Sequence, residues 1–150
     1  EVARILRHKV DSIFNILPKA KILIMGDLND YPDNKSLTDI LKANCTFNYI
    51  VDNQLYNLSA NITKNSDIGT HKHEGVWGIL DQIIVSGSLL NAKKGLLTNK
   101  DNAFIYNADF LLTDDENFTG KTNFRTYNGY KYIGGYSDHL PVFIDIDNIK

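Results

Sequence analysis

An amphipathic helix followed directly by an apolar strand is the feature that most limits how this chain can fold. Pro18 ends the helical pattern, since proline lacks the amide donor that a helix interior needs. The apolar run of residues 21–25, "KILIM", then predicts a buried strand, and this order of elements favours a layered arrangement of helix and sheet. Over residues 2–17 the apolar positions recur every three or four residues, at Val2, Ala3, Leu6, Val10, Ile13, Phe14 and Leu17.

The segment after this strand begins with polar turn residues. Residues 32–34, Pro-Asp-Asn, offer caps for a second helix over residues 35–43, "KSLTDILKA". Residues 44–68 are polar and rich in asparagine, which predicts a long excursion with little regular structure.

The second half of the chain has mainly strand character. Residues 69–90 predict two strands joined around Gly75 and Gly78, the second being residues 79–86, "ILDQIIVS". Residues 91–128 predict strands and turns without a clear period. Residues 141–147, "PVFIDID", alternate apolar and other side chains and predict a closing strand with at least one buried face.

Composition bounds the class of protein. A length of 150 residues with 43% apolar and 23% charged residues is ordinary for one soluble globular domain. A net charge of −2 and a pI near 6.1 argue against a protein that coats DNA electrostatically. The single cysteine, Cys45, excludes an internal disulfide and a thiolate zinc site within this chain. This stretch carries no signal-peptide pattern and no apolar run near the ~20 residues of a membrane span, and it leaves the compartment unknown.

Polar side chains gather at the ends of three predicted strands. Side chains two apart on a strand point the same way, which places Asp27 and Asn29 on one side and Asp30 on the other. If the three strands are neighbours in a sheet, their polar residues meet at one rim. The polar residues are Asp27, Asn29 and Asp30 after the first strand, Asp81 in the second, and Asp138 and His139 before the last.

These residue types are the ones needed to hydrolyse a phosphate ester. Asp138 and Asp27 offer the oxygen ligands that Mg²⁺ prefers. His139 is a candidate base for water, and Asp81 is a candidate to orient its imidazole. Asn29 offers an amide donor to a phosphate oxygen. Each segment also has a structural interpretation, as an Asx-capped turn, a surface loop or a buried acid.

Other polar and aromatic residues have two interpretations each. Trp77 is either a rim aromatic that packs on substrate or a core residue, and Arg125 either binds a substrate phosphate or ties down a loop. His71 and His73 alternate on a strand, but the pattern favours a solvated strand face over a metal site. Residues 114–116, Asp-Asp-Glu, are most simply a solvated turn or a helix start.

Three motifs in order resemble a known family. The segments "ILIMGDLND", "WGILDQIIVS" and "GGYSDHLPVFI" resemble the C-terminal half of the endonuclease/exonuclease/phosphatase family, which has the deoxyribonuclease-I-like fold. The resemblance implies an α+β fold, a four-layer αββα sandwich with its active site at one edge of two packed sheets. The matching residues are Gly26, Asp27, Asn29, Asp81, Ser137, Asp138 and His139.

The resemblance also implies a role for each site residue. Asp138 corresponds to a metal-site acid, and His139, held by Asp81, acts at the scissile phosphate. Asp27 orients the attacking water or a metal-bound water, and Asn29 holds a phosphate oxygen. Whether Asp27 or His139 is the general base stays open.

The family domain is about twice as long as this chain. We therefore expect residues 1–150 to be the C-terminal portion of a single domain whose N-terminal half, with a metal-binding Glu, an Asn and usually another His or Tyr, is absent. Such a fragment should bind Mg²⁺ or Mn²⁺ weakly, be inactive or nearly so, and bury its exposed sheet face by forming a homodimer.

The function that the resemblance implies is a metal-dependent phosphohydrolase. It would be a phosphodiesterase or nuclease, or a phosphatase, acting on nucleic acid or on a small phosphoester with Mg²⁺ or Mn²⁺. The alternatives are a non-catalytic binding or scaffold protein on the same fold and an unrelated α/β domain.

Overall fold

The computed structural model describes residues 1–65 and 67–150, with side chains for 1–62 and 67–150. Helix α1 (Val2–Ile16) matches the predicted helix and ends two residues before Pro18. Its buried side chains, Val10 and Phe14, lie one turn apart on the face that contacts the sheet. Among the described residues, none of the helices is long and apolar enough to cross a membrane.

The central sheet has four strands in the order β1, β6, β3, β2. They are β1 (Leu23–Asp27), β6 (Asp81–Ser86), β3 (Leu55–Asn57) and β2 (Ala43–Asn44). Strand β6 is antiparallel to both β1 and β3, and only β2 and β3 run parallel. The predicted α+β class is confirmed, and the sheet is mainly antiparallel.

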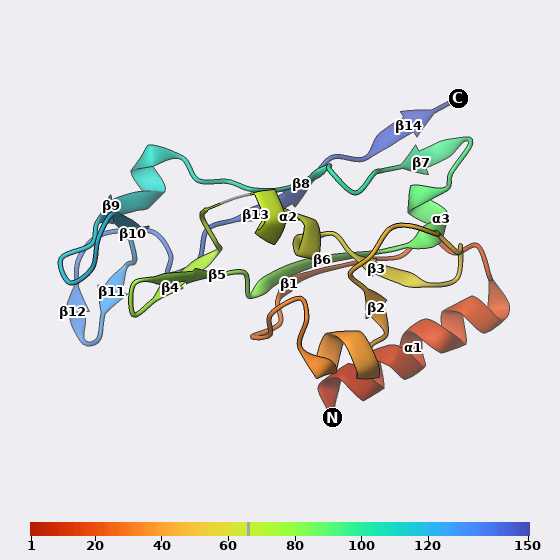
Figure 1. Cartoon of the computed structure of the whole chain (residues 1–150), viewed down its shortest axis with the longest axis horizontal. Coiled ribbons are helices and arrows are strands. Elements are labelled where there is room, and N and C mark those ends of the chain that lie inside the picture. Colours follow the sequence, from red (N-terminus) through yellow and green to blue (C-terminus); the bar gives the residue numbers. More distant parts are fainter. Residues whose placement is uncertain (66) are drawn as a thin grey trace.

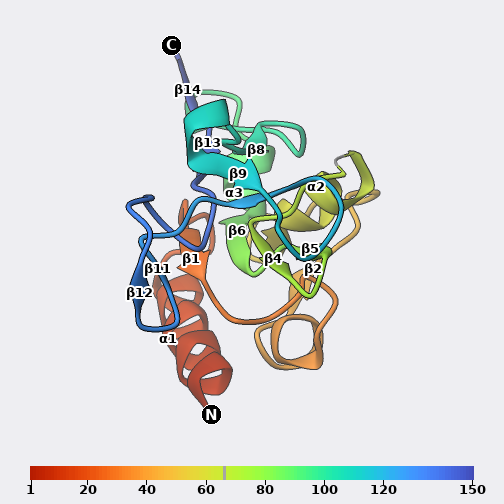
Figure 2. The same cartoon turned by 90° about the vertical axis from the view of Figure 1, so that its left-hand side faces the viewer.

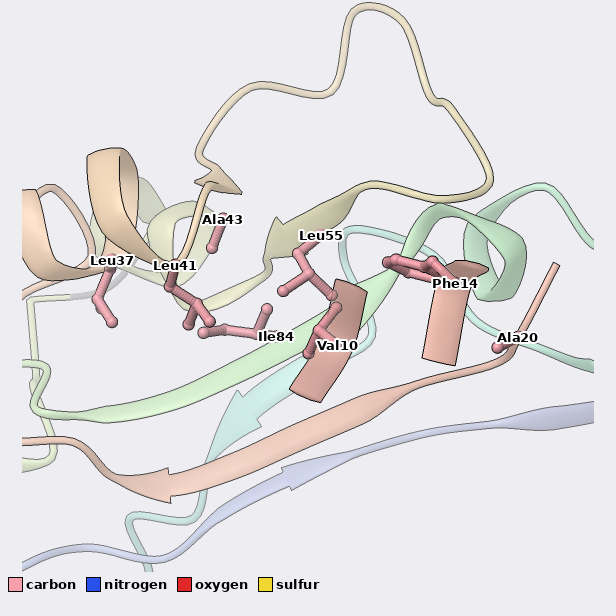
Figure 3. Packing of buried hydrophobic residues seen from close by; sticks show 8 residues of the cluster. All are labelled: Val10, Phe14, Ala20, Leu37, Leu41, Ala43, Leu55 and Ile84. Atoms are coloured by element: carbon pink, nitrogen blue, oxygen red, sulfur yellow. The ribbon is translucent and has the colours of Figure 1, made fainter. Parts of the chain in front are cut away.

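Each face of this sheet is covered by a different layer. Val10 and Phe14 of α1 pack with Ile84 of β6 in one apolar cluster, whose eight buried members are drawn in Figure 3. On the opposite face, Ile83 and Val85 pack with the strand pair β8 (Ala103–Ile105) and β13 (Val142–Ile144). Figures 1 and 2 both show α1 below the sheet and the β8–β13 pair above it.

Strand β1 is only partly buried, and on one face only, which corrects the prediction of a buried strand. Ile22 and Ile24 pack on the α1 side, whereas Leu23 and Met25 are 38% and 46% exposed. Their cross-strand partners, Val85 and Ile83, lie under the β8–β13 pair, which does not extend over the edge strand β1. The apolar run therefore identified the strand but not its coverage.

The segment 44–68 is more regular than predicted. It contains β3 and helix α2 (Ser59–Asn65). Phe47 and Ile50 pack against the apolar cluster that contains Ile83 and Val85. Phe47 and Ile50 are therefore core contacts, whereas Tyr49 between them is 82% exposed. The second helix is shorter than predicted and consists of a single π-helical turn, η1 (Ser36–Ile40). No side chain caps its N-terminal amides, so the predicted capping is not observed.

The segment 71–86 forms three strands instead of two. A tight hairpin joins β4 (His71–His73) to β5 (Val76–Gly78), with Glu74 and Gly75 both at positive φ in its turn. Strand β6 then starts separately at Asp81 and pairs with the central sheet.

The remaining elements extend the molecule at its two ends (Figure 1). Antiparallel pairs join β7 to β14, β9 to β10 and β11 to β12. In β13, Val142 and Ile144 face the core and Phe143 faces outward, which confirms the predicted strand with at least one buried face over Val142–Ile144. The strand is shorter than predicted, and the last strand of the chain is β14, which pairs with β7. The elements are α3 (Gly87–Leu90), β7 (Gly95–Leu97), η2 (Asp109–Leu111), β9 (Leu112–Asp114), β10 (Lys121–Asn123), β11 (Tyr127–Asn128), β12 (Lys131–Tyr132) and β14 (Asp147–Ile149).

Candidate active site

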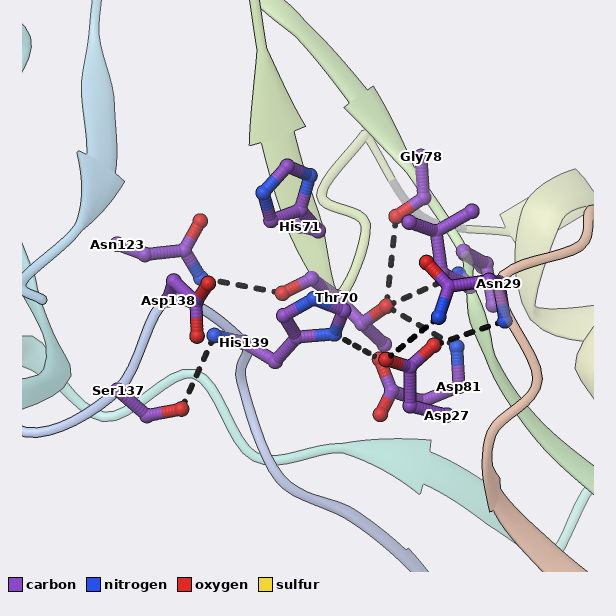
Figure 4. Close-up of polar contacts among 12 residues, drawn as sticks. Asp27, Asn29, Thr70, His71, Gly78, Asp81, Asn123, Ser137, Asp138 and His139 are labelled. Atoms are coloured by element: carbon purple, nitrogen blue, oxygen red, sulfur yellow. Dashed lines mark hydrogen bonds and ion pairs between the residues drawn. The ribbon is translucent and has the colours of Figure 1, made fainter. Parts of the chain in front are cut away.

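A carboxylate and an imidazole form the centre of the site (Figure 4). Asp81 is the first residue of β6, and its Oδ2 lies 2.6 Å from Nδ1 of His139, in the loop before β13. A carboxylate accepts, so Nδ1 carries the proton and Nε2 is left for other partners. The two side chains are only 13% and 20% exposed. The backbone amide of His139 donates to Oγ of Ser137, which fixes the loop.

Asp27 lies beside this pair because β1 and β6 place it directly opposite Asp81. Both carboxylate oxygens of Asp27 accept from Asn29, one from the backbone amide at 2.9 Å and one from Nδ2 at 3.3 Å. Asn29 has a φ of +52° and is therefore not part of the extended strand. An Asx turn brings Asp27 and Asn29 together, whereas the sequence suggested that they share one face of a strand.

Asp30 has a different role from its neighbours. Its carboxylate accepts from Nδ2 of Asn34 at 2.8 Å and from Oγ of Ser36 at 2.6 Å. It therefore stabilises the entry to η1 and stays outside the polar cluster. The polar residues of "GDLND" therefore have two separate roles: Asp27 and Asn29 belong to the site, and Asp30 holds the turn before η1.

Two sets of side chains have ligand atoms close enough to share a cation. The ligand atoms of Asp27, Asp81 and His139 lie within 4.8 Å of one another, as do those of His71, Asp138 and His139. Asp27 and Asp138 are both exposed carboxylates, the ligands that a hard divalent cation prefers, whereas Asp81 is engaged by His139. Each set therefore offers one exposed carboxylate, beside imidazole nitrogen, as a ligand for a divalent cation.

His71 and Arg125 extend the cluster on the side of the β4–β5 hairpin. Nη2 of Arg125 lies 3.3 Å from Nε2 of His71 and 4.0 Å from Oδ2 of Asp138. The rings of His71 and His139 have centroids 4.8 Å apart. Burial and the nearby positive charges of His139 and Arg125 lower the pKa of His71 below its ordinary value.

The sequence pattern favoured a solvated position for both hairpin histidines, and for His71 this is wrong. His71 is half-buried against the site, whereas His73 is exposed, with its Nε2 4.0 Å from Glu74. The alternation of the two residues in the sequence showed that both can share one face of a strand. It could not show that His71 lies in the site, because the neighbours of His71 come from distant segments.

Trp77 lies on the other face of the hairpin. It is the cross-strand partner of Lys72, whose side chain points away from that of His71. Lys72 is nearly buried, and its Nζ lies 2.9 Å from Oδ2 of Asp115. Residues 114–116 are therefore more than a solvated turn, because Asp115 pairs with Lys72, and this hydrogen bond lowers the pKa of Asp115.

Thr70 links the segments that carry the site, a role that the sequence did not reveal. Its Oγ1 accepts from the backbone amides of Leu80, at 3.1 Å, and Asp81, at 3.4 Å. Its carbonyl accepts from the amide of Leu140 at 2.7 Å and from Nδ2 of the buried Asn123 at 3.1 Å. Thr70 therefore connects the start of β6, the loop of His139 and β10.

A comparison with known protein families identifies the family of this chain. Residues 1–148 match the model of the endonuclease/exonuclease/phosphatase family. No curated protein and no solved structure matches the chain significantly. The match covers nearly the whole chain, including the "GDLND", "ILDQ" and "SDH" segments that form the polar cluster. The chain belongs to the endonuclease/exonuclease/phosphatase family.

Proposed function

We propose that this protein is a metal-dependent phosphohydrolase that cleaves a phosphoester by attack of water at phosphorus. The observation that carries the proposal is the Asp81–His139 contact of 2.6 Å with Asp27 and Asp138 on either side. The pair supplies a base, and the two exposed carboxylates supply ligands for a cation. The family match supports hydrolysis of a phosphoester as the reaction class.

His139 is the proposed general base. Its Nδ1 proton is held by Asp81, so Nε2 presents a lone pair to an incoming water. Asp81 keeps the imidazole in this tautomer and stabilises the imidazolium that forms when the water loses its proton.

Asp27 is the proposed orienting residue. Because both of its oxygens already accept from Asn29, its carboxylate is less free to take a proton than Nε2 of His139. Mg²⁺ or Mn²⁺ would be held at Asp138, in the set with His71 and His139, or at Asp27, in the set with Asp81 and His139, and would supply Lewis-acid stabilisation of charge on the phosphate. The amide of Asn29 is a donor for a phosphate oxygen.

The test is hydrolysis of p-nitrophenyl phosphate and bis-p-nitrophenyl phosphate with Mg²⁺ or Mn²⁺, in the protein as its gene encodes it. We expect His139→Ala to lower kcat by at least ~10², the lower end for loss of a general base. His8→Ala, an exposed histidine on α1, is the matched control. Cation-dependent turnover that is equal in wild type and His139→Ala would overturn the assigned base. The absence of turnover on both substrates and on nucleic acid would favour a binding or scaffold function.

We also propose that the uncovered apolar face of β1 is an interface. Leu23 and Met25 are half-exposed on the face that β8 and β13 cover elsewhere, and Phe104 and Phe143 form an exposed stacked pair with centroids 5.1 Å apart. In a four-layer αββα sandwich, apolar sheet faces of this kind lie inside the molecule. In this chain, we propose that a second copy of the protein covers them.

Sedimentation equilibrium tests this interface. We expect the chain of 150 residues to dimerise and Met25→Glu to be monomeric, because a charge on this face opposes its burial. Tyr49→Glu, at an exposed tyrosine outside the strands, is the control. A wild-type chain that remains monomeric at high concentration would exclude the homodimer.

A further inference from the structure

The number of hydrogen-bond donors around the site bears on the class of phosphoester. A phosphodiester has two non-bridging oxygens, whereas a phosphomonoester has three and one more negative charge. In the proposed function, a cation at Asp138 or Asp27 and the amide of Asn29 each serve one of these oxygens. A further cationic donor gains more from the third charged oxygen of a monoester than from the uncharged ester oxygen that replaces it in a diester.

His71 and Arg125 provide such additional donors. Arginine can only donate, so in the contact between Arg125 Nη2 and His71 Nε2 the histidine accepts, and the ring proton of neutral His71 is on Nδ1. The guanidinium carries five N–H groups, and its contacts to His71 and Asp138 use only part of them. Arg125 thus has further N–H groups to donate beside Asp138, and neutral His71 has one N–H group, on Nδ1.

The position of this pair fits an anion. The ring centroids of His71 and His139 are 4.8 Å apart with the rings tilted by 38°, and Arg125 lies next to both His71 and Asp138. A phosphoryl group bound between Asp138 and His139 would therefore meet the guanidinium, whose planar fork suits phosphate oxygens.

A pocket continues from the pair on the side of the hairpin. It has a volume of about 550 Å³ and is lined mainly by polar and charged side chains, among them Glu74, Asn128 and Lys131. This volume lies within the range of small-molecule sites, about 300–1,000 Å³. It suits the alcohol portion of a small polar phosphoester.

We propose that His71 and Arg125 form a subsite for the third non-bridging oxygen of a phosphomonoester, so that the preferred substrate is a small, polar phosphate monoester. The proposal rests on the proposed function, because it takes the scissile phosphate to lie among Asp27, Asp138 and His139. A diester lacks the third charged oxygen and gains less from the subsite.

The first experiment compares kcat/KM for p-nitrophenyl phosphate and bis-p-nitrophenyl phosphate. We expect His71→Ala and Arg125→Ala to lower the monoester-to-diester ratio by about 10- to 100-fold, the range for a lost charge-assisted hydrogen bond. Arg125→Lys, which keeps the charge but not the fork, should lower the ratio by less, and His8→Ala should leave it unchanged. An unchanged ratio in His71→Ala and both Arg125 variants overturns the proposal, even where the wild-type enzyme is active.

The second experiment measures binding without turnover. Inorganic phosphate is titrated into the protein while the side-chain ¹⁵N signals of the histidines and of Arg125 are followed by NMR. We expect His71 and Arg125 to shift with saturation, His8 not to shift, and Arg125→Ala to bind more weakly. Saturable binding in a protein without hydrolase activity supports the subsite and rejects the proposed function. Hydrolysis without any response of His71 or Arg125 rejects the subsite and leaves the proposed function intact.

Discussion

Oδ2 of Asp81 lies 2.6 Å from Nδ1 of His139, a contact between the first residue of β6 and the loop before β13. It decides which nitrogen of the ring carries the proton, because the carboxylate can only accept. The reactive face of the imidazole is therefore set by a residue far away in the sequence.

Replacing Asp81 by asparagine should invert this tautomer. The amide of Asp81→Asn can donate to Nδ1, which moves the ring proton to Nε2 and removes the base. We expect kcat to fall by at least ~10² with a smaller change in KM. Steady-state kinetics in the presence of Mg²⁺ measure this, with Asp33→Asn, an exposed acid in the turn before η1, as control. Equal losses in both variants would contradict the assignment.

His71 should make folding stability depend on pH. Its pKa in the folded protein is lowered from 6.5 by burial and by the charges of His139 and Arg125. Below pH 6.5 the unfolded chain takes up this proton before the folded chain does, so the free energy of unfolding falls as the pH drops. Urea unfolding between pH 7 and pH 5 should show a smaller decrease in His71→Gln than in wild type. Parallel curves would show that His71 is equally easy to protonate in both states.

Asn123 should be important for stability as well as for the site. It is almost fully buried, and its side chain accepts from the amide of Lys72 at 3.1 Å and donates to the carbonyl of Thr70 at 3.1 Å. Asn123→Ala leaves two buried backbone groups without this partner, at a cost of about 1–3 kcal/mol for each group that stays unpaired. Chemical denaturation measures the loss. The exposed Asn128→Ala is the control, and a variant as stable as wild type would refute the role.

Leu41 should carry much of the packing under α1. Its side chain is fully buried in the cluster with Val10, Phe14 and Ile84. Leu41→Ala should lower the free energy of unfolding by about 2–5 kcal/mol, through lost burial and the cavity left behind. Ile16→Ala, at a side chain 86% exposed, should change it by no more than about 0.5 kcal/mol. Urea denaturation compares the two, and similar losses would contradict the packing described.

Local physical chemistry determined much of the fold and of the site. The period of residues 2–17 fixed α1, because only one helical face can be buried, and Pro18 fixed where it ends. The apolar runs located β1, β6 and β13. The residue types of Asp27, Asn29, Asp81, Asp138 and His139 identified the chemistry, because few side chains can bind a cation and move a proton.

The tertiary structure decided which residues meet. The antiparallel register of β1 and β6 sets Asp27 opposite Asp81, and the same sheet leaves Leu23 and Met25 uncovered. The pattern of residues 69–78 gave no reason to separate His71 from His73, because both alternate on one strand. Only the contacts of His71 with His139 and Arg125, which come from later parts of the chain, place it in the site. Periodicity reports which face of an element is buried, whereas pairing between distant segments depends on how the elements pack, and no local pattern encodes that packing.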